Sequence, residues 1–136
     1  MGRIMAIDYG SKRVGVAVTD SLKIIANGLT TVDRKDIMKF LENYFKKEEV
    51  ECLVVGDPRR FGMDDTMAEQ ADKFSEHLKK KFPGLKIDRM NEMYTSKMAF
   101  QTMIDSGLKK EARKNKGLID EISATIILQS YMEAKK

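Results

Sequence analysis

The sequence has few of the residues that would indicate a disulfide-stabilised, fibrous or membrane-spanning protein. It contains one cysteine, Cys52, so no disulfide can form within the chain, as is typical of proteins in a reducing cytosol. Two prolines and nine glycines in 136 residues argue against a fibrous or disordered chain. No apolar run approaches the ~20 residues of a membrane span. Because Asp8 interrupts the first apolar run, we expect no signal peptide, no membrane contact and a cytoplasmic location.

Histidine is equally scarce, and this excludes several kinds of site. The single histidine, His77, falls on the polar side of an amphipathic segment, and no His/Cys cluster is available for zinc. Cys52 lies within an apolar run and is expected to be buried rather than reactive. Hydrophobic residues at 42% and charged residues at 34% indicate one globular domain spanning residues 1–136. The net charge of +4 allows a polyanionic partner without demonstrating one.

Hydrophobic periodicity predicts strands in the first quarter of the chain and alternating helices and strands after it. The expected strands are residues 3–8, 14–19, 23–32 (with a bulge at Asn27-Gly28), 52–56 and 85–90. The expected helices run from an N-cap at Asp33 to residues 46–47, from 67 to 81, around 98–104, and from 118 to 133. Three short consecutive strands indicate an antiparallel meander, and the later crossovers indicate parallel pairing. We therefore predict an α/β fold with a five-stranded mixed sheet and helices on both faces.

Three acids are placed where such a sheet would bring them together. Asp8 ends the first strand, Glu92 follows the last, and Asp120 lies in the first turns of the terminal helix. Each has a structural alternative: a turn cap, a solvated loop acid and a residue favoured by the helix dipole. Ligand sites in α/β sheets form beyond the carboxyl ends of strands. Converging carboxylates suit Mg²⁺ or Mn²⁺, and one or two such ions would support phosphodiester hydrolysis.

Basic residues flank these acids in the sequence. Lys12 and Arg13 follow Asp8 in a Gly-Ser-Lys turn, Arg59 and Arg60 follow the fourth strand, and Lys116 ends a basic run that starts at 109. Lysine and arginine clusters are the expected contacts for backbone phosphates, although each cluster could equally be a solvated loop. We therefore expect a nucleic-acid substrate. Tyr9 could either stack on a base or pack against the protein.

The same residues resemble a known family. The run Asp-Tyr-Gly-Ser-Lys-Arg-Val-Gly-Val-Ala at 8–17 is similar to the amino-terminal signature of the YqgF family. The resemblance continues through residues 55–58, 92–99 and 116–131, so it covers nearly the whole chain in the right order. YqgF proteins are small bacterial ribonuclease H-like proteins, described as pre-16S ribosomal RNA nucleases and as Holliday junction resolvases.

This resemblance implies a ribonuclease H-like fold, a divalent metal and a cytoplasmic location. It also implies that Asp8, Glu92 and Asp120 are the catalytic acids. Two features depart from the family pattern. Asn91-Glu92-Met93 stands where the family has Asp-Glu-Arg, so a phosphate contact is lost at Met93. The loop after the fourth strand lacks the usual Pro-Leu pair, and Arg59 and Arg60 there could replace the lost charge.

Several functions stay open at this level. The expected one is a metal-dependent endonuclease that matures the 5′ end of pre-16S ribosomal RNA. The alternatives are a resolvase of four-way DNA junctions, a non-catalytic RNA-binding factor in ribosome assembly, and a nucleotide-binding module. The last is disfavoured because actin-like ATPases need a second such lobe. We expect a monomer or a weak homodimer.

Overall fold

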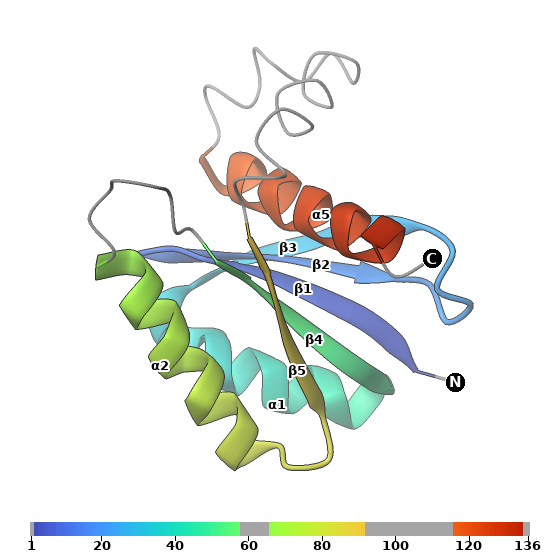
Figure 1. Ribbon diagram of the computed structural model, residues 1–136, viewed down its shortest axis with the longest axis horizontal. Helices are drawn as coiled ribbons and strands as arrows, with labels where there is room; N and C mark the ends of the chain where they lie inside the picture. The colour runs from blue at the N-terminus through green and yellow to red at the C-terminus, as the bar shows by residue number, and fades with distance from the viewer. Residues whose placement is uncertain (1, 58–65, 92–115, 135–136) are drawn as a thin grey trace.

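The computed structural model describes residues 2–57, 66–91 and 116–134 (Figure 1). Its strands are β1 (Arg3–Tyr9), β2 (Arg13–Thr19), β3 (Ala26–Asp33), β4 (Val50–Asp57) and β5 (Lys86–Asn91). Its helices are α1 (Ile37–Lys47), α2 (Thr66–Lys81) and α5 (Lys116–Ala134), with a 3-10 turn at Arg34–Asp36. The element order confirms the prediction for these parts of the chain. The helix expected at 98–104 lies outside the described residues.

The five strands form one mixed sheet in the order β3-β2-β1-β4-β5. β1 pairs antiparallel with β2, and β2 pairs antiparallel with β3. β1 pairs parallel with β4, and β4 pairs parallel with β5. The predicted sheet, with an antiparallel meander followed by two parallel strands, is confirmed. β1 is the central strand and runs parallel to β4 and β5, so the carboxyl ends of these three strands lie at the same edge of the sheet.

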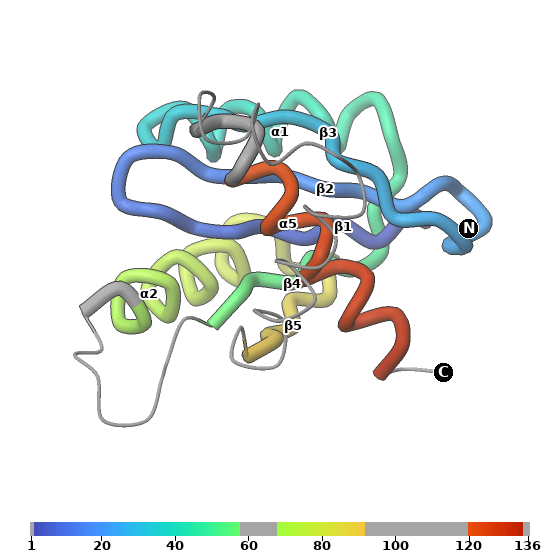
Figure 2. The backbone as a smooth tube through the Cα atoms, turned by 90° about the horizontal axis from the view of Figure 1, so that it is seen from above, coloured from blue at the N-terminus to red at the C-terminus, as the bar shows by residue number. Residues whose placement is uncertain are grey.

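Helices cover both faces of the sheet, as predicted (Figure 1). Met5 and Ile7 of β1 pack against α1 and α2, together with side chains of β2 and β4 on the same face (Val14, Val16, Val18, Leu53 and Val55). Ala6, Ala17 and Val54 face the other way and pack against α5. Seen from above, α5 crosses over the strands (Figure 2). α5 is buried along much of its length. No described helix is long and apolar enough to cross a membrane.

The third strand begins later than predicted, at Ala26 instead of Lys23. The carboxylate of Asp20 accepts hydrogen bonds from the backbone N–H groups of Ile24 and Ile25 at 2.8 and 2.9 Å. These bonds close a turn in which Lys23 adopts φ 59°, so the segment cannot continue the strand. The predicted bulge is present one residue further on. Val16 pairs with Thr30 and Ala17 with Gly28, which leaves Leu29 as the extra residue.

The start of the first helix also differs from the prediction. Asp33 ends β3 and precedes the 3-10 turn, but its side chain makes no capping hydrogen bond. The α-helix itself begins at Ile37, and Ile37 and Leu41 bury its apolar side. Packing of this side against the sheet, more than a side-chain cap, therefore holds α1 in place.

Candidate active site

Asp8 occupies the penultimate position of the central strand. It pairs in register with Gly15 of β2 and is half-buried. Side chains alternate between the faces of a strand, so Asp8 shares a face with Ala6, which packs against α5. The predicted strand-end acid thus lies on the α5 face, at the carboxyl end of β1.

Gly15 allows α5 to approach this position closely. A Cβ at Gly15 would lie 1.9 Å from the carbonyl oxygen of Asp120 and 3.1 Å from the amide nitrogen of Glu121. Only glycine can fit there, so the first turns of α5 rest directly on the backbone of β2. Because Gly15 is the partner of Asp8, this contact brings Asp120 to the end of the sheet where Asp8 lies.

Arg13 forms an ion pair with Asp120. Its Nε donates a hydrogen bond of 2.8 Å to Oδ2 of the acid, and both side chains are partly exposed. Arg13 reaches this position from a tight turn in which the N–H of Gly10 donates to the carbonyl of Arg13 at 3.0 Å. A Cβ at Gly10 would lie 2.5 Å from that same carbonyl oxygen, so the turn also requires glycine.

The sequence placed Arg13 beside Asp8 as a phosphate ligand and did not indicate its pairing with Asp120. The two residues are 107 positions apart, and no local pattern links them. Lys12 is exposed in the turn before β2. Lys116 is the first residue of α5 rather than part of a linker.

The remaining predicted site residues, Glu92, Arg59 and Arg60, lie outside the described residues. Within the described ranges, no three His, Cys, Asp or Glu side chains are grouped so that they could hold a metal ion. Of the predicted site residues, the structure therefore places Asp8, Arg13 and Asp120 at the same end of the sheet.

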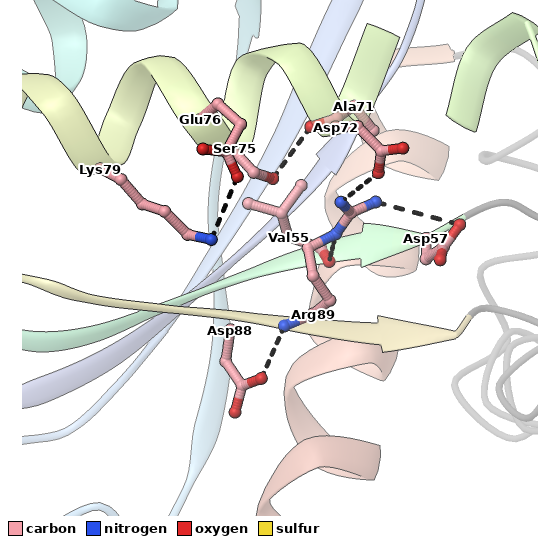
Figure 3. Close-up of polar contacts among 9 residues, drawn as sticks. All are labelled: Val55, Asp57, Ala71, Asp72, Ser75, Glu76, Lys79, Asp88 and Arg89. Carbon is pink, nitrogen blue, oxygen red and sulfur yellow. Dashed lines mark hydrogen bonds and ion pairs between the residues drawn. The ribbon is translucent and has the colours of Figure 1, made fainter. Parts of the chain in front are cut away.

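Arg89 is a polar residue near this end of the sheet that the sequence reading missed (Figure 3). Its Nε donates to the carbonyl of Val55 at 3.2 Å, and its Nη1 donates to Oδ1 of Asp72 on α2 at 2.6 Å. Its Nη2 is buried without a hydrogen bond and lies 3.9 Å from Oδ1 of Asp57. Arg89 thus ties α2 to the end of β4. The sequence does contain one indication of this role. Arg89 lies two residues after Ile87, which packs against the core, so the strand alternation places Arg89 on the same inward face.

A second polar cluster lies farther back on the α5 face, and its chemistry is structural. Tyr131 donates a hydrogen bond of 2.8 Å to Oδ2 of Asp88, and its hydroxyl oxygen lies 3.6 Å from Sγ of Cys52. Burial, together with the bond to Asp88, raises the pKa of the Tyr131 hydroxyl. Burial also raises the pKa of the Cys52 thiol. Cys52 is therefore a protonated core residue, and its predicted burial is confirmed.

Comparison with known proteins agrees with the sequence and the fold. The model of the RuvX family, described as Holliday junction resolvase, matches residues 2–134. A Christiangramia forsetii protein named "Putative pre-16S rRNA nuclease" is 57% identical over 97% of this chain and 98% of its own. A Flavobacterium johnsoniae protein of the same name is 52% identical over 100% of this chain and 99% of its own.

A solved structure, T. thermophilus RuvC in complex with Holliday junction substrate, shares the fold. Its TM-score is 0.62 at 15% sequence identity, covering 99% of this chain and 96% of that one. The ribonuclease H-like fold expected from the sequence is therefore confirmed. Together with the family match and the relatives above half identity, this fold leads to one conclusion: the chain belongs to the RuvX family.

Proposed function

We propose that this protein is a divalent-metal-dependent endonuclease that hydrolyses phosphodiester bonds of precursor 16S ribosomal RNA in the cytoplasm. The names of its relatives support the reaction and the substrate. The observation that carries the proposal is the contact of Gly15 with the backbone of Asp120. Because Gly15 pairs with Asp8, two acids from opposite ends of the chain lie at one end of the sheet.

Asp8, Glu92 and Asp120 are the residues that would hold one or two Mg²⁺ or Mn²⁺ ions. The donor set fits, since the two described acids offer hard carboxylate oxygens at the carboxyl end of the central strand. Such an ion, when bound, lowers the pKa of a water and stabilises the leaving oxygen. By fixing the position of any cation that they hold, these carboxylates would determine how the phosphodiester is oriented.

Arg13 has two roles in this proposal. Its Nε holds the Asp120 carboxylate in one orientation through Oδ2. Its terminal nitrogens form no ion pair with another described residue, and they supply donors for a phosphate oxygen next to the acids. Lys12, which is exposed, would supply a further phosphate contact, and Arg59, Arg60 and Lys116 remain predicted phosphate ligands.

The test is cleavage of precursor 16S ribosomal RNA by wild type, Asp8→Asn and Asp120→Asn, each with Mg²⁺, Mn²⁺ or EDTA. Mutation of a residue that only hydrogen-bonds to a metal ligand typically lowers metal affinity or activity 10–100-fold. Asp8→Asn and Asp120→Asn change proposed ligands directly, so we expect each to lower the cleavage rate by more than about 100-fold. Glu133→Gln is the matched control, because Glu133 is an exposed acid on the same helix as Asp120. Calorimetry with Mn²⁺ should show weaker binding by both aspartate variants only.

Equal cleavage by Asp8→Asn and wild type would contradict the proposal. RNA binding that persists in EDTA, with no cleavage by wild type under any metal, would instead indicate a non-catalytic RNA-binding factor. Measurable ATP binding by calorimetry would favour a nucleotide-binding module.

A four-way DNA junction is the second candidate substrate, supported by the description of the family. Symmetric cleavage of a junction needs two subunits, whereas cleavage of a precursor RNA end needs one. Side-by-side assays on the RNA and on a DNA junction, with the solution mass measured in parallel, separate the two. A strictly monomeric mass with cleavage of RNA alone would exclude the resolvase.

A further inference from the structure

A cavity of about 640 Å³ lies beside the turn between β1 and β2. Tyr9 lines it, and Tyr9 follows Asp8 in the strand, so the two side chains lie on opposite faces of the sheet. The cavity is therefore on the α1 and α2 side, away from Asp120. Its lining consists of Tyr9, Ser11, Lys12, Asp33, Arg34 and Lys35.

Arg34 is held in a fixed orientation within this lining. Its guanidinium carbon lies 4.5 Å from the ring centroid of Tyr9, and its Nε donates to the Tyr9 hydroxyl at 2.6 Å. Tyr9 in turn stacks on the buried ring of Phe74, with centroids 4.3 Å apart. A guanidinium fixed on an aromatic face loses little side-chain freedom when it binds a ligand. Tyr9 thus packs against the protein, which settles the alternative left open by the sequence.

The cavity is lined by more basic than acidic side chains. Lys12, Arg34 and Lys35 form no ion pair with any acid in the described parts of the chain, in contrast to Arg13 and Arg89. Asp33 is the single carboxylate among the six lining residues. Neighbouring cations repel one another, and an anion bound between them relieves that repulsion.

We propose that this cavity binds a backbone phosphate of the same nucleic-acid strand that is cleaved at Asp8 and Asp120. The assignment rests on the proposed function. A strand that passes over the end of the sheet at the β1–β2 turn meets Asp8 on one face and Arg34 on the other. The contact is to the sugar–phosphate backbone and not to a base, because the lining offers cationic donors and the Tyr9 ring is already packed by Phe74 and Arg34.

The test measures the binding of a labelled single-stranded RNA, and of a DNA of the same sequence, in EDTA so that no cleavage occurs. Fluorescence anisotropy over a range of salt gives affinity and the number of phosphate contacts. We expect Arg34→Gln and Lys35→Gln each to weaken binding about three- to tenfold and to lower the salt slope by about 0.7 on either strand. Lys80→Gln, which removes the same charge from the last turn of α2, is the control. Arg34→Lys should recover only part of the affinity, because it restores charge without the planar stack.

Three results would overturn this inference. The first is a loss in both variants no greater than that of Lys80→Gln. The second is a loss confined to Arg34→Gln together with a lower Tm, which would show that Arg34 only supports Tyr9. The third is displacement of the RNA by AMP or ATP at equal phosphate concentration, which would identify a mononucleotide site instead. Failure of wild type to cleave any substrate would refute the proposed activity and leave the binding result standing, so the two failures are distinguishable.

Discussion

Gly15 lies so close to Asp120 that a Cβ on the glycine would fall 1.9 Å from the carbonyl oxygen of the acid. The separation of α5 from β2 at this point is therefore set by backbone contact and not by interlocking side chains. Since Asp8 is the strand partner of Gly15, the same contact fixes how near the two acids lie. A site that needs its carboxylates within a narrow range of distances depends on this glycine.

Gly15→Ala should therefore damage stability and activity together. The added methyl group must push the first turns of α5 away from β2, and overpacking of this kind costs about 1–3 kcal/mol. The displacement moves Asp120 from Asp8, so we expect nuclease activity to fall further than the change in folding predicts. Urea unfolding and a cleavage assay measure the two effects. Gly84→Ala is the control, because nothing lies within 4 Å of a Cβ at that position; similar behaviour of both variants would contradict this account.

Arg13→Gln should separate catalysis from stability. Its ion pair with Asp120 is partly exposed, and such pairs contribute about 0–1 kcal/mol to the free energy of unfolding. Loss of the bond that orients Asp120 should weaken Mn²⁺ binding, and loss of the phosphate donors should slow cleavage. Calorimetry and single-turnover kinetics check these two changes. Tighter Mn²⁺ binding by the variant would contradict the orienting role and show that Arg13 competes with the metal for Asp120.

Arg89→Met should destabilise the fold by about 1.5–3 kcal/mol, the range for hydrogen bonds to charged groups. The substitution removes the donors to Val55 and Asp72 and leaves the Asp72 and Asp57 carboxylates without this cation (Figure 3). Chemical denaturation gives the magnitude. Asp72→Asn keeps an acceptor for Arg89, so it should lower the free energy of unfolding by less than Arg89→Met does. Equal stability of Arg89→Met and wild type would mean that packing alone fixes α2 on the sheet.

Tyr131→Phe should change how stability depends on alkaline pH. The pKa of the Tyr131 hydroxyl is raised in the folded state, whereas an unfolded tyrosine titrates near 10. The stabilisation is therefore complete below pH ~10 and is lost as the pH rises through the folded pKa, because only the unfolded chain then releases the proton. We expect the wild type to be more stable than the variant at pH 7 and the difference to shrink above pH ~10. A constant difference across this range, measured by denaturation at each pH, would contradict the shift.

Most of the fold was predictable because its elements carry local patterns. Val14, Val16 and Val18 alternate on β2, and the apolar residues of α1 and α2 recur at helical spacing. The boundary errors arise from side-chain contacts that periodicity does not encode. Asp20 closes a turn with Ile24 and Ile25, and this turn, not strand propensity, decides where β3 begins.

The positions of two candidate acids could be predicted from the sequence, whereas the contacts around them could not. Asp8 lies at the end of a strand and Asp120 lies among apolar residues of a helix. Both positions can be predicted from the neighbouring residues in the sequence. The pairing of Arg13 with Asp120 depends on how β2 and α5 meet in space, so the sequence could not show it. The predicted roles of the site residues stay predictions, both for the acids as metal ligands (Asp8, Glu92 and Asp120) and for the cations as phosphate ligands (Lys12, Arg13, Arg59, Arg60 and Lys116).

The placement of Asp120 on α5 has a consequence for when the protein becomes active. β1, β2 and β3 can assemble as soon as they are synthesised, because their pairing is local, whereas α5 is made last among the described elements and packs back onto all three. At a synthesis rate of 5–20 residues per second, Asp120 follows Arg13 out of the peptidyl transferase centre by about 5–20 s. Until α5 has been made and has packed onto the sheet, the chain therefore has no pair of acids. The proposed site is completed by the last of the described elements to be synthesised, so Asp8 and Asp120 cannot meet before the elements that carry them into place have emerged.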